Sequence, residues 1–297
     1  MTFRTRFSIS ALVCILLAAA GFAQGLSVSY LEGSVEQLSG SNWTPVQIGD
    51  QVAGNASLRL ARDAYVEISA PNGLVKLSKA GTYMLSDVVK GSASVQKANL
   101  ASLVAGRVQK LTQKTAGDRA STVGGVRAEK ANVEKLSWAG DENMQELLER
   151  GIKEMTAGNF ARALDSFEEA RAASDADSAR RVDFYTGYTL YLKGDGRRAF
   201  KTLKAVSAKP ADDFHGLYVI TLAGLYLEAN DPADALGLLD TYAGADKESA
   251  QSVLFLKGLA LKQSGDNASA RRTLISARDL EPASEAGKAA SAALAEL

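Results

Sequence analysis

Hydrophobic and polar residues follow two different periods in the two halves of this chain. From residue 26 to 86, apolar and polar positions alternate in short runs, separated by turn-forming pieces such as SGSN, APNG and KAG. Alternation with a period of two is typical of strands with one buried face. The pattern predicts strands over 26–31, 34–39, 43–48, 57–61, 64–69 and 74–78. Residues 101–111 and 120–138 also have the composition of strands, so the sequence predicts an all-β domain over 26–140.

From about residue 142 the pattern changes, and apolar residues recur at steps of three and four, as in amphipathic helices. Four segments share one motif. It consists of a Gly or Asn, a second turn-forming residue, an alanine five residues after the first, and a large apolar residue four positions further on. The alanines are Ala163, Ala199, Ala235 and Ala270, and the large residues are Phe167, Leu203, Leu239 and Leu274. The spacings of 36, 36 and 35 residues predict a helical repeat.

A further small residue precedes each alanine by twelve positions, at Gly151, Gly187, Ala223 and Gly258. Small residues at a fixed place on paired helices predict that the two helices cross closely there. The segment KGDG at 193–196 then becomes a turn between two helices. The alternative is a phosphate-binding loop, because two glycines precede a pair of arginines. Such a loop would follow a strand, however, and the equivalent segments of the other units do not fit it.

This motif, in units of about 34 residues, resembles the tetratricopeptide repeat, and the segment from Ser252 to Pro282 matches that family best. The units span about 144–177, 180–213, 216–249 and 251–284, within a helical domain over 142–297 that ends in a capping helix. Glu154 stands where the family has a large apolar residue, and Tyr242 stands where a small one is usual. The resemblance implies an all-α solenoid that binds proteins.

The first half resembles the FecR-type domain. SYLEGSVEQLSG, WTPVQIGD and AYVEISAPNG follow the order of that family's strands, and ASTVGGVRAEK at 120–130 is similar to its later signature. Ala128 and Glu129 depart from that signature, which usually has Gly and Thr there. The resemblance implies a small all-β domain, solenoid- or sandwich-like, used for sensing or protein contact outside the cytoplasm. The expected fold class is therefore multidomain, β followed by α.

The first 23 residues have the layout of a secretory signal peptide, with Arg4 and Arg6, an apolar run, and Gly21-Phe22-Ala23 before the expected cleavage. An uncleaved membrane anchor is the alternative. Cys14, the only cysteine, lies inside the run, so we expect no disulfide and no Cys-based metal site after cleavage. No other stretch reaches membrane-spanning length. We expect a secreted protein without a membrane span, located in the bacterial periplasm.

The distribution of charge gives limited information about possible partners. The 34 basic and 34 acidic residues balance, so no bulk charge favours nucleic acid, and we expect none as a partner. Residues 24–140 hold 13 basic and 9 acidic residues, whereas residues 141–297 hold 19 and 25. Six basic residues of the first half are candidates for contact with a polyanion such as a cell-wall polymer, and the alternative is a solvated polar face of strands. They are Arg107, Lys110, Lys114, Arg119, Arg127 and Lys130.

The sequence offers little catalytic chemistry. His215, the only histidine, follows Asp212 and Asp213, but one histidine with two carboxylates is a poor metal-ligand set. Capping and solvation of a helix start are the expected role of the two aspartates. Glu168 and Glu169 are expected on an outer helix face. No nucleophile, zinc or calcium motif is present, and a carbohydrate-acting enzyme would need a carboxylate pair that the sequence does not show. We expect neither an enzyme nor a cofactor.

In tetratricopeptide arrays the first helix of each pair lines a concave groove. The resemblance places there Leu148, Ile152, Met155, Phe184, Tyr188, Tyr191, Leu217, Ile220 and Phe255, with Leu227 and Leu259 beside them. An apolar groove suits a hydrophobic segment of a partner, unless the chain's own β domain or last helix covers it. We therefore expect an adaptor that binds a cell-envelope protein there, while the β domain contacts a second protein or an envelope polymer. A sensor that binds a ligand in the β domain is the alternative.

Overall fold

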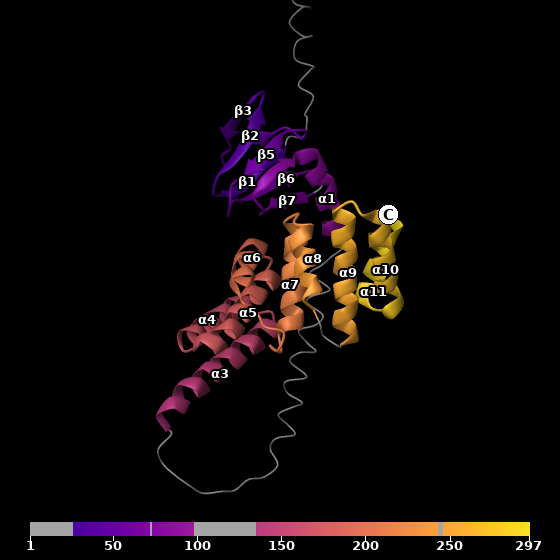
Figure 1. The fold of residues 1–297 in the computed structure, drawn as a ribbon. Coiled ribbons are helices and arrows are strands. Elements are labelled where there is room, and N and C mark those ends of the chain that lie inside the picture. The colour runs from indigo at the N-terminus through magenta and orange to yellow at the C-terminus, as the bar shows by residue number, and fades with distance from the viewer. Residues whose placement is uncertain (1–25, 72, 98–134, 243–245) are drawn as a thin grey trace, which may run out of the picture. The chain divides into compact units, whose positions relative to one another are not determined.

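The computed structural model describes residues 26–71, 73–97, 135–242 and 246–297. The chain forms two compact units. We call them the β unit, which contains the strands, and the helical unit, which contains the helices from α3 onward (Figure 1). A β region followed by a helical region was the predicted layout, and it is confirmed.

The described strands of the β unit form two four-stranded sheets, with orders β4-β1-β6-β7 and β3-β2-β5-β8. Neighbours pair antiparallel along β4-β1-β6 and along β3-β2-β5-β8. The strands are β1 (Leu26–Glu32), β2 (Val35–Ser39), β3 (Asn42–Pro45), β4 (Gln51–Val52), β5 (Ser57–Leu60), β6 (Tyr65–Ala70), β7 (Gly73–Leu77) and β8 (Gly81–Met84).

The period of two places alternate side chains in the core of the β unit. Leu58 and Leu60 of β5 are buried while Arg59 between them is exposed, and Val66 and Ile68 of β6 are fully buried. All six strands predicted between residues 26 and 78 overlap an observed strand. The two-residue β4 lies in a segment that the sequence assigned to a turn, because two residues are too few to display a period.

After Met84 the structure departs from the sequence prediction. A helix, α1 (Leu85–Lys97), follows directly, and the next described element, α3, begins at Lys135. The predicted strand over 120–138 is therefore wrong for residues 135–138. These residues extend the helix that follows them, because adding residues to a helix costs less than starting a new element. Residues 101–111, the signature at 120–130 and the signal peptide at 1–23 lie outside the described residues.

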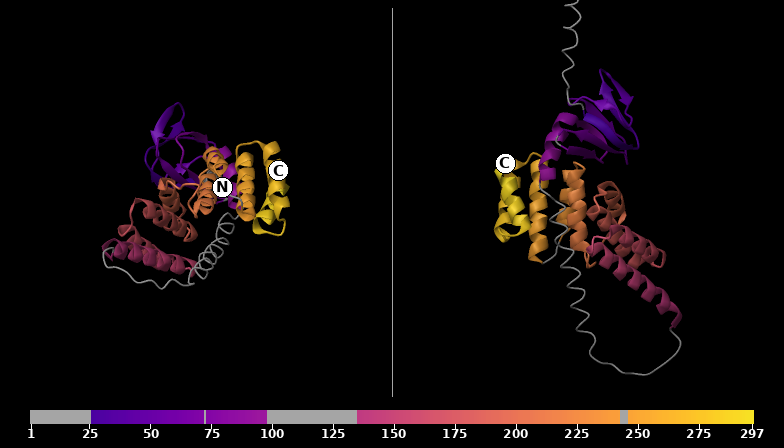
Figure 2. Two further views of the ribbon diagram at one scale, coloured as in Figure 1. Left: turned by 60° about the horizontal axis from the view of Figure 1, so that its bottom comes forward. Right: turned by 180° about the vertical axis from the view of Figure 1, so that it is seen from behind.

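The helical unit consists, in its described part, of four consecutive helix pairs and a final helix. Figures 1 and 2 show the pairs side by side in chain order. The pairs are α3 (Lys135–Thr156) with α4 (Phe160–Ala172), α5 (Ala176–Leu192) with α6 (Gly196–Ala205), α7 (His215–Glu228) with α8 (Pro232–Asp240), and α9 (Lys247–Gln263) with α10 (Asn267–Leu280). The final helix, α11 (Glu285–Ala295), packs against α9 and α10.

The turn between the two helices of each pair uses the same two positions. The first has a positive φ, at Gly158 (79°), Gly194 (88°), Asn230 (55°) and Gly265 (86°). This left-handed conformation favours Gly and Asn, which explains those residue types. The second position is the N-cap of the second helix, at Asn159, Asp195, Asp231 and Asp266. Each aspartate accepts a hydrogen bond from the backbone N–H three residues later. The segment KGDG is thus a turn between helices, as predicted.

The small residue of the first helix lies against the large apolar residue of the second. A Cβ atom added at Gly187 would lie 2.7 Å from Cγ of Leu203, and one added at Gly258 would lie 2.5 Å from Cγ of Leu274. At Gly151 the distance to the ring of Phe167 would be 2.3 Å. Real Cβ atoms do not approach their neighbours so closely, so only glycine fits. The predicted close crossing is confirmed for these three pairs.

This contact generates the first prediction. In the wild type, Gly187→Ala gains helix propensity but drives a methyl group into Leu203, and we expect a net loss of about 1 kcal/mol of unfolding free energy. In a Leu203→Ala background the methyl group has room, and the same change should stabilise the protein by about 0.5–1 kcal/mol. Urea denaturation of the four proteins measures both effects. An equal effect of Gly187→Ala in the two backgrounds would contradict the close crossing.

Candidate functional site

The structure buries most of the side chains that the sequence assigned to a groove. Phe184, Tyr188 and Phe255 have no exposed surface, and Tyr191 is 7% exposed. The others that are buried are Leu148, Met155, Leu217, Ile220, Leu227 and Leu259. Ile152 alone of the set is partly exposed. This corrects the expectation of an open apolar groove at these residues, because a fully buried side chain cannot touch a partner.

Aromatic packing shows what several of these residues do instead. The ring of Phe184 stacks on the ring of Phe214 at 4.7 Å and on that of Tyr188 at 5.8 Å, with interplanar angles of 15° in both cases. Tyr185 meets Phe184 edge-on at 5.1 Å. Such pairs add about 0.5–1.5 kcal/mol beyond the area that they bury. Phe214 belongs to the connection between α6 and α7, so the stack fastens this connection to α5.

An open depression of about 570 Å³ lies on the helical unit, next to Phe214. Its volume falls in the range of ligand-binding sites, about 300–1,000 Å³. We call it the α3–α5 pocket. Its lining comes from α3 (Met144, Gln145, Leu148), from α5 (Asp177, Ser178, Arg180, Arg181) and from the connection between α6 and α7 (Lys209, Ala211, Asp212, Asp213, Phe214). Of the predicted groove residues, Leu148 lies in this lining.

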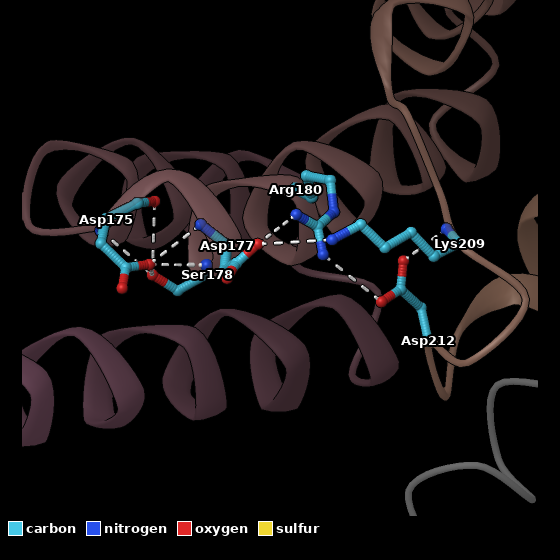
Figure 3. A network of polar contacts seen from close by, with 6 residues as sticks. All are labelled: Asp175, Asp177, Ser178, Arg180, Lys209 and Asp212. Carbon is cyan, nitrogen blue, oxygen red and sulfur yellow. Dashed lines mark hydrogen bonds and ion pairs between the residues drawn. The ribbon is translucent and has the colours of Figure 1, made fainter.

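Charged side chains at the pocket form one connected network (Figure 3). Arg180 Nη1 lies 2.5 Å from Asp177 Oδ1, and its Nη2 lies 3.6 Å from Asp212 Oδ1. Lys209 Nζ lies 3.7 Å from Asp177 Oδ1, and the Lys209 backbone N–H donates to Asp212 Oδ2 at 2.7 Å. These contacts tie the connection between α6 and α7 to the start of α5.

A third ion pair, between Arg181 and Asp213, joins the same two segments. The three basic and three acidic side chains of the lining therefore balance. The Nε atoms of Arg180 and Arg181 are buried, and neither has a hydrogen-bond partner in the described part of the chain. Each guanidinium group thus carries a donor that no group of the described residues satisfies.

The start of α5 keeps its carboxyl groups ionised. Asp175 is the N-cap and accepts hydrogen bonds from the backbone N–H groups of Asp177 and Ser178 and from the Ser178 hydroxyl. The hydrogen bond from that hydroxyl is the main reason why the pKa of Asp175 is lowered. The hydrogen bond from Arg180, followed by the charge of Lys209, lowers the pKa of Asp177. The Ser178 hydroxyl serves the cap, so it is not placed as a nucleophile.

The remaining candidates for chemistry lie apart from the pocket or outside the described chain. Glu168 and Glu169 are exposed on α4, as expected. Among the described residues, no group of three or more His, Cys, Asp and Glu side chains could hold a metal ion. No helix in the described ranges is both long and apolar enough to cross a bilayer. The six candidate polyanion contacts, Arg107, Lys110, Lys114, Arg119, Arg127 and Lys130, lie outside the described residues.

Sequence reasoning missed the connection between α6 and α7 as part of a site. It runs over nine residues, 206–214, whereas three residues join α4 to α5. Its greater length and its aspartate pair, Asp212 and Asp213, were the available signal. The pairing of these aspartates with Arg180 and Arg181 joins residues 32 positions apart, which no local pattern reveals.

No protein-family model matches this chain, and no curated protein or solved structure matches it either.

His215 gives the second prediction. It is 7% exposed at the start of α7, and its backbone N–H donates to the carbonyl of Asp212 at 3.0 Å. Burial lowers the pKa of His215 below 6.5, and the charge of Asp212 offsets part of this effect. The unfolded chain therefore takes up a proton at higher pH than the folded chain does. The contribution of His215 to the free energy of unfolding is complete above its pKa in the unfolded chain. It decreases as the pH falls towards the pKa of His215 in the folded chain.

We expect the free energy of unfolding to decrease from neutral to mildly acidic pH, and His215→Gln to flatten that decrease. Urea denaturation across this range tests the expectation. Asp175 and Asp177 remain in the variant. The stability that their ionised carboxylates contribute is lost only when the pH falls towards the ordinary pKa of an aspartate, 3.8. Identical slopes for the wild type and the variant would show that His215 does not titrate differently in the two states.

Proposed function

We propose that this protein is an exported, non-enzymatic adaptor that binds an extended segment of a partner protein in the α3–α5 pocket. The observation that carries the proposal is the mixed lining of the pocket. Met144, Leu148 and Phe214 contribute the small amount of apolar surface that the lining exposes, and six charged side chains share the lining with them. Pockets of this kind gain affinity from the apolar surface and orientation from a few polar groups.

The balance of charge favours a peptide over a small ion. Three basic and three acidic side chains face the same cavity, so no excess of either sign is left for a metal ion or a simple anion. Lys209 and Asp177 are 62% and 80% exposed, so their ion pair exchanges readily with charged or polar groups of a ligand. A protein segment supplies both signs together with backbone donors and acceptors.

We further propose that the helix pairs are tetratricopeptide repeats and that the β unit is a FecR-like domain. For the helical unit, support comes from the repeated left-handed turn, the repeated N-cap and the glycine crossings. The pocket draws its helical lining from α3 and α5, the first helices of two successive pairs, where the family forms its concave face. For the β unit, support comes from the quoted motifs and the observed strands.

Location and partners follow from the sequence. The signal-peptide pattern of the first 23 residues supports export to the periplasm, which makes a cell-envelope protein the expected partner. In this proposal the β unit contacts a second protein or a cell-wall polymer, so that the chain joins two components of the envelope.

Site-specific photocrosslinking in the native envelope gives the third prediction. A photoreactive amino acid at Gln145, in the pocket lining, should trap one discrete partner. The same amino acid at the exposed Glu168, on α4, should not. Charge reversal by Lys209→Glu should reduce the Gln145 product about tenfold or more, because it adds repulsion beside Asp177 and Asp212.

Lys247→Glu is the matched control, because it reverses an exposed charge at the start of α9, which does not line the pocket. We expect it to leave the Gln145 product unchanged. The proposal fails if Gln145 and Glu168 trap the same proteins, or if both charge reversals weaken the product equally.

A further inference from the structure

One of the four second helices differs from the others in charge. Helix α4 holds two basic and three acidic residues, α8 holds two acidic residues, and α10 holds three basic residues and one acidic residue. Helix α6 holds four basic residues and no acidic residue. They are Arg197, Arg198, Lys201 and Lys204. We call this set the α6 basic face.

The basic residues lie opposite the side of α6 that packs into the helical unit. Ala199, Phe200 and Leu203 are buried. Arg197, Lys201 and Lys204 follow one another at steps of four and three residues, which places them on one face of the helix. Arg198, beside them, is exposed, as are Lys201 and Lys204, and Arg197 is partly exposed. Lys193, also exposed, ends the preceding helix and adds a fifth positive charge nearby.

The stability of the helix explains this arrangement only in part. Lys204 in the last turn suits the helix dipole, and Arg198 pairs with Asp195 Oδ2 at 3.6 Å, but like charges three or four residues apart destabilise a helix. Bulk charge does not account for the face either, because residues 141–297 hold 19 basic and 25 acidic residues. A concentrated positive face on an otherwise acidic segment indicates a role in binding an anion.

We propose that the α6 basic face binds the anionic headgroup surface of a phospholipid bilayer. The large apolar residues of α6 are buried, so this face lacks the exposed apolar or aromatic anchor that a protein interface uses. For the same reason α6 cannot insert into the hydrocarbon. What remains is electrostatic attachment to a surface of many negative charges. This inference does not depend on the α3–α5 pocket.

Vesicle flotation tests the proposal with the complete mature chain. The protein should float with vesicles of phosphatidylcholine and phosphatidylglycerol at low salt, and high salt should release it. Vesicles of phosphatidylcholine alone should not bind it. Each lysine or arginine near the surface strengthens partitioning about fivefold. The triple variant Arg198→Gln, Lys201→Gln, Lys204→Gln should therefore partition about a hundredfold more weakly.

Helix α10 provides the matched control. The variant Arg271→Gln, Arg272→Gln, Arg278→Gln also removes three basic residues from a second helix, and it should change partitioning by less than about threefold if attachment is local to α6. Far-ultraviolet circular dichroism confirms that both variants keep the wild-type helix content. Equal losses of partitioning in the two variants would overturn the proposal. So would wild-type protein that does not bind anionic vesicles, or that binds vesicles with and without phosphatidylglycerol equally.

Soluble glycerol phosphate, added at the same phosphate concentration as the vesicles, separates a surface from a single headgroup. Displacement of the protein by this small anion would contradict attachment to a bilayer surface. Continued flotation is the result that we expect.

Discussion

The close approach of the two helices in each pair is the constraint on which the helical unit depends. At Gly151, Gly187 and Gly258 the first helix presents only backbone, and a phenylalanine or leucine of the second helix fills the space. Close-packed interiors tolerate neither an extra methyl group nor a void at such a place. The contact recurs in three of the four described pairs, and Ala223 takes the same place in the fourth. The left-handed residue and the N-cap recur at the turn of all four pairs.

The candidate site lies where the repeat departs from regularity. Turns inside the pairs are short and alike, whereas the connection between α6 and α7 is longer, carries Phe214 into the aromatic stack and carries Asp212 and Asp213 to the arginines of α5. The regular packing holds α5 with its charged residues Asp177, Arg180 and Arg181, and the irregular connection adds Lys209, Asp212 and Asp213. Binding sites are often built this way, with variable segments held on a stable scaffold.

Hydrophobic periodicity predicted most of the fold, because strands bury alternate residues and helices bury residues three and four positions apart. Six of the eight described strands, the four helix pairs and the turn at Gly194 follow from such local signals, whereas β4 and β8 were not predicted. Helix α1 was missed, since its small and polar residues give a weak pattern. The resemblance placed Phe184 and Tyr188 at a groove, and the pattern of residues could not correct this, because an apolar residue that faces the next helix has the same spacing as one that faces a partner. The pocket depends on pairs such as Arg180 with Asp212, which are distant in the sequence.

The central claim is that the aromatic residues of α5 form a packed core, which leaves the charged pocket beside it as the candidate site. Hydroxyl-radical footprinting of the unmodified protein, read by mass spectrometry, tests this claim most directly. Met84, which is 51% exposed, serves as the reactive reference. The account predicts rapid oxidation of Met84 and no measurable oxidation of Phe184 or Tyr188. Oxidation of Tyr188 at the rate of an exposed tyrosine would contradict it and would restore the open groove.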